Sequence, residues 1–266
     1  MPNTISIIAG YLLHLMIGGF DRPYHPAAIL RKMIRFYETK FRAFSMDEGR
    51  AGVLLVFSIV FDVFVTSMLL LLLARFVHPL LAFLVSTYFI FGLFSLKSLA
   101  ENVLAFRIGL EAKEPATARE SLGRLLRADP GEGDEKKMIG MALEAIAKET
   151  VRGIIAPLLY TALGGAALGM AAKAVRILRD GEGGGEDNAF LSPACRLDDA
   201  LNFIPARISP WLISASAFFT GLKGGGAFRE GFRSGPYFRD ADLGFAVASF
   251  GGALGTELPG LPQNAN

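Results

Sequence analysis

Residues Gly52–Ser95 read GVLLVFSIVFDVFVTSMLLLLLARFVHPLLAFLVSTYFIFGLFS. Among these 44 residues, only Asp62 and Arg75 carry a formal charge. A helix needs about 20 mostly apolar residues to cross roughly 30 Å of hydrocarbon. The stretch is therefore long enough for two membrane spans. We expect the chain to turn at His78-Pro79, because a residue before proline avoids the helical region, and the two spans to form an antiparallel hairpin.

The remainder of the chain contains further apolar segments. Of its 266 residues, 52% are hydrophobic and 20% are charged, whereas soluble domains carry about 25% charged residues. The first apolar run has no basic residue before Arg22 and no small-residue cleavage signal, so we interpret it as a retained span. The sequence predicts an all-α, polytopic helical integral membrane protein with amphipathic extramembrane helices. Its single domain covers residues 1–256 and precedes a disordered tail at 257–266. The expected spans lie near residues 5–20, 52–75, 79–96 and 151–175.

The fourth apolar segment is ambiguous because Pro157 and Gly164-Gly165 interrupt it. It is either a plain span or a broken, re-entrant hairpin. Broken helices are tolerated at membrane depth only where they are buried in protein or line a cavity.

The segment 97–150 differs from the spans. Its charges alternate in sign, and its apolar residues recur at helical spacing, which favours amphipathic helices outside the membrane. There are seven Lys or Arg residues in 21–50 and nine in 97–149. By the positive-inside rule, both segments face the cytoplasm. We expect a multi-pass protein of the inner (cytoplasmic) membrane, with the lipid bilayer as a partner.

Composition also argues against two classes of partner. The net charge of +2 gives no basis for nucleic-acid binding. A single cysteine, Cys195, cannot form an intramolecular disulfide, and no CxxC pattern supports a structural zinc or iron–sulfur site.

Several polar stretches stand out against this background. His25-Pro26 opens a basic helix, for which the alternative is a capped, solvated helix start. Glu144 and Lys148 are spaced as a helical ion pair and lead, with Glu149, into an apolar segment. Asp62 is an acid within a span, a costly placement that suggests function unless the carboxylate reaches interfacial water.

The stretch Arg196–Arg207 carries adjacent aspartates, Asp198 and Asp199, with Asn202 three residues after the second. Magnesium prefers such oxygen ligands, completed by phosphates and waters. On one helix, Asp199 and Asn202 share a face. The alternative is a helix start with ordinary surface acids.

Read together, these stretches resemble the adenosylcobinamide-phosphate synthase family of cobalamin biosynthesis. The resemblance covers roughly residues 5–255 and is strongest over Asp198–Arg207. The residues that carry it are His25-Pro26, Glu38, Ala147-Lys148-Glu149, Gly153, Ala156-Pro157, Lys173-Ala174, Asp198-Asp199, Asn202, Pro205-Ala206-Arg207 and Gly251-Gly252.

The resemblance implies a ligase. It would join an amino-alcohol, aminopropanol or its phosphate, to a propionate side chain of the corrinoid adenosylcobyric acid, with ATP and Mg²⁺. A carboxylate activated as an acyl phosphate needs its phosphoryl charge neutralised by a metal and by cations. The candidate metal ligands are Asp198 and Asp199. The candidate catalytic residues are His25, Lys148, Glu149 and Arg207, and the candidate substrate-binding residues are Lys173 and Asn202. A homo-oligomer is left open.

The chain also departs from the family pattern. Arg152 stands where the family carries an aspartate before glycine, and Lys148-Glu149 replaces a glutamate-asparagine pair. The run asparagine-threonine-leucine-aspartate-serine becomes Arg176–Asp180. These changes leave an alternative open, in which the chain is a non-catalytic membrane paralogue with a sensing or partner-binding role. An unrelated transporter is disfavoured, because transport would normally need more spans with polar residues inside them.

Overall fold

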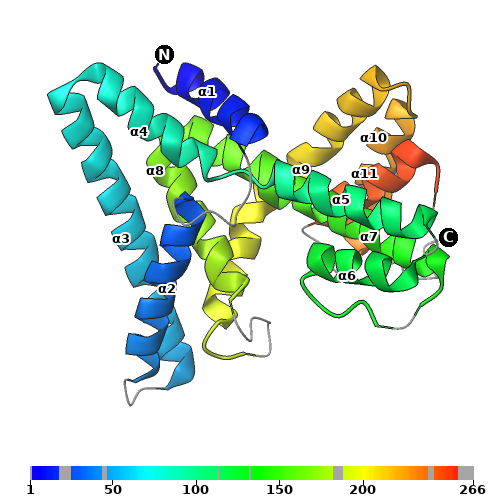
Figure 1. Ribbon diagram of the computed structural model, residues 1–266, viewed down its shortest axis with the longest axis horizontal. Coiled ribbons are helices and arrows are strands. Elements are labelled where there is room, and N and C mark those ends of the chain that lie inside the picture. The colour runs from blue at the N-terminus through cyan, green and yellow to red at the C-terminus, as the bar shows by residue number, and fades with distance from the viewer. Residues whose placement is uncertain are drawn as a thin grey trace. The chain divides into compact units, whose positions relative to one another are not determined.

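The computed structural model describes residues 2–17, 25–43, 47–112, 114–131, 133–181, 188–238 and 243–256. Within these ranges every regular element is a helix, which confirms the predicted all-α class (Figure 1). The predicted disordered tail at 257–266 and the end of the predicted first span, at 18–20, lie outside the described residues. The elements are α1 Pro2–Ile17, α2 Pro26–Arg42, α3 Glu48–Val77, α4 Pro79–Phe91, α5 Leu96–Glu111, α6 Pro115–Leu126, α7 Glu135–Thr150, the π-helix η1 Val151–Ile155, α8 Ala156–Arg179, α9 Ser192–Phe219, α10 Gly224–Ser234, the 3₁₀-helix η2 Gly235–Tyr237 and α11 Gly244–Leu254.

The chain divides into two compact units. Unit 1 comprises residues 1–94 and 156–201, and unit 2 comprises 95–155 and 202–266. The single domain predicted over residues 1–256 stays a prediction.

Among the residues that the structure describes, three helical stretches are long and apolar enough to cross a membrane by length and composition. They are Glu48–Val77, Pro79–Glu111 and Glu135–Arg179, and two shorter apolar helices cover Thr4–Ile17 and Gly244–Leu254. The prediction of a multi-pass membrane protein is thereby confirmed. The expected span at 79–96 ends within the second stretch, because α4 stops at Phe91 and α5 begins at Leu96.

Side-chain caps fix where helix α3 of unit 1 begins and where the chain turns into α4. The Asp47 carboxylate caps its start by accepting a hydrogen bond from the Arg50 amide at 3.3 Å. At its other end, His78 leaves the helical conformation and caps α4, since its Nδ1 accepts from the Leu80 amide at 3.1 Å. The chain turns back there, and α4 packs against α3 as predicted (Figure 1).

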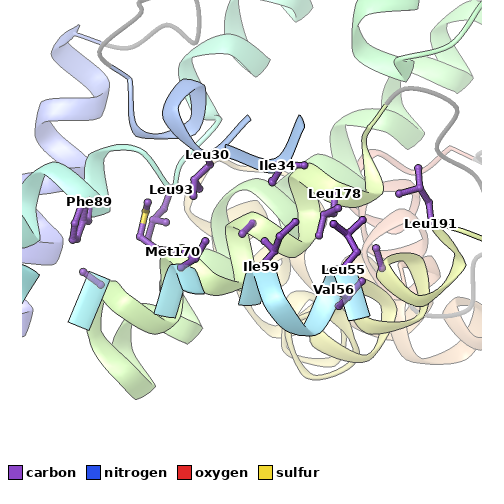
Figure 2. Packing of buried hydrophobic residues seen from close by; sticks show 14 of the residues in the cluster. Leu30, Ile34, Leu55, Val56, Ile59, Phe89, Leu93, Met170, Leu178 and Leu191 are labelled. Carbon is purple, nitrogen blue, oxygen red and sulfur yellow. The ribbon is translucent and has the colours of Figure 1, made fainter. Parts of the chain in front are cut away.

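One face of α3 packs into the core of unit 1, and the other faces outward. Leu55 and Ile59 are fully buried, together with residues of α2, α4, α8 and α9 (Figure 2). On the outer face, Phe57, Phe61 and Phe76 are 68%, 60% and 93% exposed. Soluble proteins rarely expose so continuous an apolar surface, which is the surface that a bilayer would cover.

The fourth apolar segment is broken rather than continuous. Gly164 and Gly165 leave the helical conformation within α8, and Gly165 has φ 70° and ψ −170°, a region open essentially to glycine alone. A Cβ built on Gly169 would lie 2.8 Å from Thr161 Oγ1. Eight residues of unbroken helix would separate these positions by about 12 Å along the axis. The two halves of α8 therefore fold back on each other at the glycine pair.

The described part of unit 2 holds two smaller cores. In the first, Ala118 and Leu122 of α6 pack with Phe106, Met138 and Ala142, as the amphipathic pattern predicted. The second is built by α7, η1, α9 and the pair α10 and α11, which lie side by side (Figure 1).

In unit 2, aromatic residues of α9 and α10 pack against each other. The Trp211 ring packs edge-on against Phe228 at 4.6 Å and against Phe232 at 6.1 Å between ring centroids. Trp211 is nevertheless 61% exposed.

Candidate functional site

In unit 1, His25 lies just before α2 and is buried. Its Nδ1 accepts a hydrogen bond from the Ala27 amide at 3.2 Å, so the ring caps the helix, and it packs on Phe91 with centroids 5.0 Å apart. The pKa of His25 is lowered to about 4, mainly by burial and in addition by the neighbouring basic residues Lys173, His14 and Arg31. The imidazole is therefore neutral at neutral pH, with its ring proton on Nε2.

Two buried basic side chains lie at the end of α4. Lys173 of α8 donates from Nζ to the Leu93 carbonyl at 2.9 Å, and His14 of α1 makes a 3.2 Å hydrogen bond from Nδ1 to the Phe91 carbonyl. The last carbonyls of a helix lack intrahelical partners, and cations there are favoured by the helix dipole. His14 thus satisfies the carbonyl of the last residue of α4, and Lys173 binds the carbonyl of Leu93, two residues beyond the helix end.

The structure thus brings the predicted residues His25 and Lys173 into one group, with His14 and Arg31 as further members. We call these four residues the basic cluster. Elements α1, α2 and α8 each contribute to it, and its chemistry suits a carboxylate or phosphate. Sequence analysis missed His14, because a histidine in an apolar run gives no signal of its own.

The two aspartates predicted as metal ligands lie at the start of α9. The Asp198 side chain is 4% exposed, and its Oδ2 accepts from Arg179 Nη1 at 3.0 Å. The same Nη1 contacts Oδ1 of Asp199, whose side chain is 29% exposed. Arg176, on the last turn of α8, pairs at 3.5 Å with Asp180, which directly follows the helix.

This arrangement does not fit a magnesium ion as it stands. Both carboxylates are directed to one guanidinium nitrogen, and the described residues hold no group of three or more His, Cys, Asp or Glu that could bind a metal. The assignment of Asp198 and Asp199 as metal ligands stays a prediction.

In unit 2, Glu149 lies at the end of α7, next to the π-helix. The buried Ser95 hydroxyl donates a 2.6 Å hydrogen bond to Glu149 Oε1, and the Ser95 amide donates to the Gly153 carbonyl at 3.4 Å. A Cβ on Gly153 would collide with the Ser95 hydroxyl and lie 2.8 Å from Glu149 Oε1. Glycine at position 153 therefore makes room for this hydrogen bond, which sequence analysis did not anticipate.

The other predicted residues of unit 2 are also held in place. Lys148 forms the expected pair with Glu144 at 2.9 Å. Asn202 is buried, with 3% of its surface exposed. The Arg207 guanidinium stacks on Phe203 at 3.3 Å from the ring centroid, and Nη1 donates to the Phe203 carbonyl at 2.9 Å. Stacking orients its remaining N–H groups, as anion recognition requires.

Asp62, the acid within α3, has local hydrogen-bond donors. It accepts from the Tyr37 hydroxyl at 3.1 Å and from Thr66 Oγ1 at 3.3 Å. Burial raises the pKa of Tyr37, and its hydrogen bond to Asp62 raises it further. The hydrogen bond from Tyr37 joins α2 to α3. These donors therefore account for Asp62 by a structural role.

Comparison with known proteins gives a consistent result. The family model described as CobD/Cbib protein matches residues 7–263. The chain belongs to this family. No solved structure was found to match it.

Individual relatives in the CobD/CbiB family align with this chain over most of their length. The cobalamin biosynthesis protein CobD of Clostridium perfringens is 31% identical over 262 residues, which are 96% of this chain and 82% of the relative. CobD of Photorhabdus laumondii is 30% identical over 95% of this chain and 81% of its own. The cobalamin biosynthesis protein CbiB of Salmonella arizonae is 29% identical over 96% and 81%. The resemblance found in the sequence is confirmed.

Proposed function

We propose that this chain acts in cobalamin biosynthesis as a membrane-bound ligase. The observation that carries the proposal is the family match over residues 7–263, together with relatives that are named cobalamin biosynthesis proteins. The proposed reaction is amide formation between aminopropanol, or its phosphate, and adenosylcobyric acid. ATP with magnesium is the proposed energy source, and the inner membrane is the proposed location.

The reaction requires two displacements. The corrin carboxylate attacks the γ-phosphorus of ATP, which gives an acyl phosphate and releases ADP. The amine then attacks the acyl carbon, inorganic phosphate leaves, and a base accepts the proton that the amine loses. The protein must therefore bind several anionic groups and provide a proton acceptor.

The basic cluster of unit 1 supports the first requirement. Lys173 offers a buried ammonium group that the Leu93 carbonyl orients, and such a group stabilises a carboxylate or phosphate. His25 is neutral at neutral pH, so it can take up a proton or position a substrate group without adding charge.

Glu149 and Arg207 of unit 2 support the remaining roles. Glu149 is a fixed carboxylate that could accept the amine proton, since Ser95 holds one of its oxygens. Arg207, stacked on Phe203, and Lys148 are the proposed contacts for phosphate or corrin carboxylates, and buried Asn202 is a proposed substrate contact.

A second candidate is a non-catalytic paralogue of the same fold, with a sensing or partner-binding role. It is favoured by the Arg179 guanidinium on Asp198 and Asp199, which occupies carboxylates expected to bind a metal. It is also favoured by Arg152, which stands at a position where the family is expected to carry an acid.

Complementation of a bacterial strain that lacks its cobinamide-phosphate synthase distinguishes the two. The variants are Lys173→Met and Glu149→Gln, with Lys136→Met on the exposed side of α7 as the matched control. A ligase predicts rescue by the wild type and the control and loss of rescue in both site variants. Absence of rescue by wild-type protein that is present in the membrane would favour the non-catalytic paralogue.

A further inference from the structure

Asp198 and Asp199 need a cation between them. Neighbouring ionised carboxylates repel each other, and a carboxylate as buried as Asp198 is costly unless it is paired. In this chain the cation is a side chain of the protein itself, Arg179, whose Nη1 contacts one oxygen of each aspartate.

The position of Arg179 accounts for this pairing. Arg179 is the last residue of α8, where a positive charge is favoured by the helix dipole, and both aspartates lie in the second turn of α9. The contact thus joins the end of one helix to the beginning of the next. A guanidinium is always protonated and recognises carboxylates better than an ammonium group does.

A magnesium ion shared by the two carboxylates would need oxygen ligands at about 2.0–2.1 Å. One oxygen of each carboxylate already contacts Arg179 Nη1. A metal ion that bridges these two oxygens cannot occupy this place together with the guanidinium. The tethered cation also has the advantage of a high effective concentration over any ion in solution.

We propose that the Arg179 guanidinium is the resident cation of Asp198 and Asp199, and that this pair binds no divalent metal ion in the native protein. Removing the guanidinium converts the pair into a divalent-cation site, because the carboxylates then lose the positive charge that contacts one oxygen of each. The inference concerns metal binding alone and does not depend on the proposed ligase activity.

The test uses the full-length chain purified in detergent, without nucleotide or corrinoid. Mn²⁺ serves as the probe, and electron paramagnetic resonance measures the unbound ion. We expect Arg179→Gln to bind Mn²⁺ at least about tenfold more tightly than the wild type, roughly 1.4 kcal/mol. This gain should vanish in the triple variant Arg179→Gln, Asp198→Asn, Asp199→Asn. Arg107→Gln, which removes the exposed partner of Glu111, is the matched control and should bind like the wild type.

Two results would overturn the proposal. One is tight Mn²⁺ binding by the wild type that Asp199→Asn abolishes, and the other is a folded Arg179→Gln variant that gains no affinity. Should Arg179→Gln fail to fold, wild type against Asp199→Asn decides alone: equal Mn²⁺ binding supports the proposal, and a loss in the variant contradicts it. Since no substrate is present, a failed complementation experiment leaves this outcome unaffected.

Discussion

The Ser95 hydroxyl donates a 2.6 Å hydrogen bond to the Glu149 carboxylate, across 54 residues of sequence. It connects the start of α5 to the end of α7 within unit 2. Hydrogen bonds to charged groups contribute about 1.5–3 kcal/mol, more than neutral ones, and this one orients a candidate catalytic carboxylate.

Replacing Ser95 by alanine tests this contact. We expect Ser95→Ala to lower the free energy of unfolding by about 1.5–3 kcal/mol, because Glu149 loses a buried donor. Thermal unfolding in detergent measures the change. The matched control is Thr117→Val, which removes an exposed 3.0 Å hydrogen bond to Glu114 and should alter stability by less than about 0.5 kcal/mol. Equal effects of the two substitutions would contradict a special role for Ser95.

Gly153 offers a steric test of the same group. In Gly153→Ala the added methyl collides with the Ser95 hydroxyl and crowds Glu149, so the hydrogen bond must break or shift. We expect a loss of stability of about 1–3 kcal/mol and reduced complementation. The control is Gly225→Ala in α10, where nothing lies within 4 Å of the new methyl. A Gly153→Ala protein as stable and as active as this control would show that the contact tolerates displacement.

Burial of His25 predicts a dependence of stability on pH. Its pKa is about 4 in the folded chain against 6.5 ordinarily, so below pH 6.5 the unfolded state binds a proton that the folded state does not. This difference in proton binding gives His25 a contribution to the free energy of unfolding that is fully present above pH 6.5 and is lost as the pH falls toward 4. It amounts to at most about 3 kcal/mol.

Substitution by asparagine isolates this contribution, because asparagine keeps a capping side chain but does not titrate. Melting temperatures between about pH 7.5 and 4.5 should fall less steeply for His25→Asn than for the wild type. His78→Asn is the matched control, since His78 also caps a helix through Nδ1 but is exposed. Parallel curves for His25→Asn and wild type would exclude His25 as the source.

The break in α8 depends on Gly165. An alanine there would have to adopt φ 70° and ψ −170°, which costs a residue with a Cβ about 1–3 kcal/mol. We expect Gly165→Ala to lower the melting temperature and to increase protease sensitivity near the glycine pair, while Gly225→Ala behaves like the wild type. An unchanged melting temperature would mean that α8 can straighten at little cost.

Much of the fold could be predicted because the signals are local. The apolar run of α3 and the turn at His78-Pro79 follow from composition and proline geometry. Helical spacing in the segment 97–150 predicted amphipathic helices, and Ala118 and Leu122 on one of them are fully buried. The glycine pair left a continuous span and a broken helix as alternatives, and the structure shows the break in α8.

The contacts of the candidate site could not be predicted, because they join distant parts of the chain. Lys173 and Leu93 are 80 residues apart, and nothing in either stretch indicates that one accepts a hydrogen bond from the other. Arg179 appeared in the sequence only as a departure from the family pattern. Its contacts with Asp198 and Asp199 become visible once α8 and α9 are folded.

Trp211 has a practical consequence. It is the only tryptophan in the chain, so every tryptophan photon comes from one ring beside Phe228 in unit 2. Intrinsic fluorescence therefore monitors this unit without an attached dye. Because the ring is largely exposed, quenching by brominated lipids of graded depth would measure how far Trp211 lies from the bilayer centre.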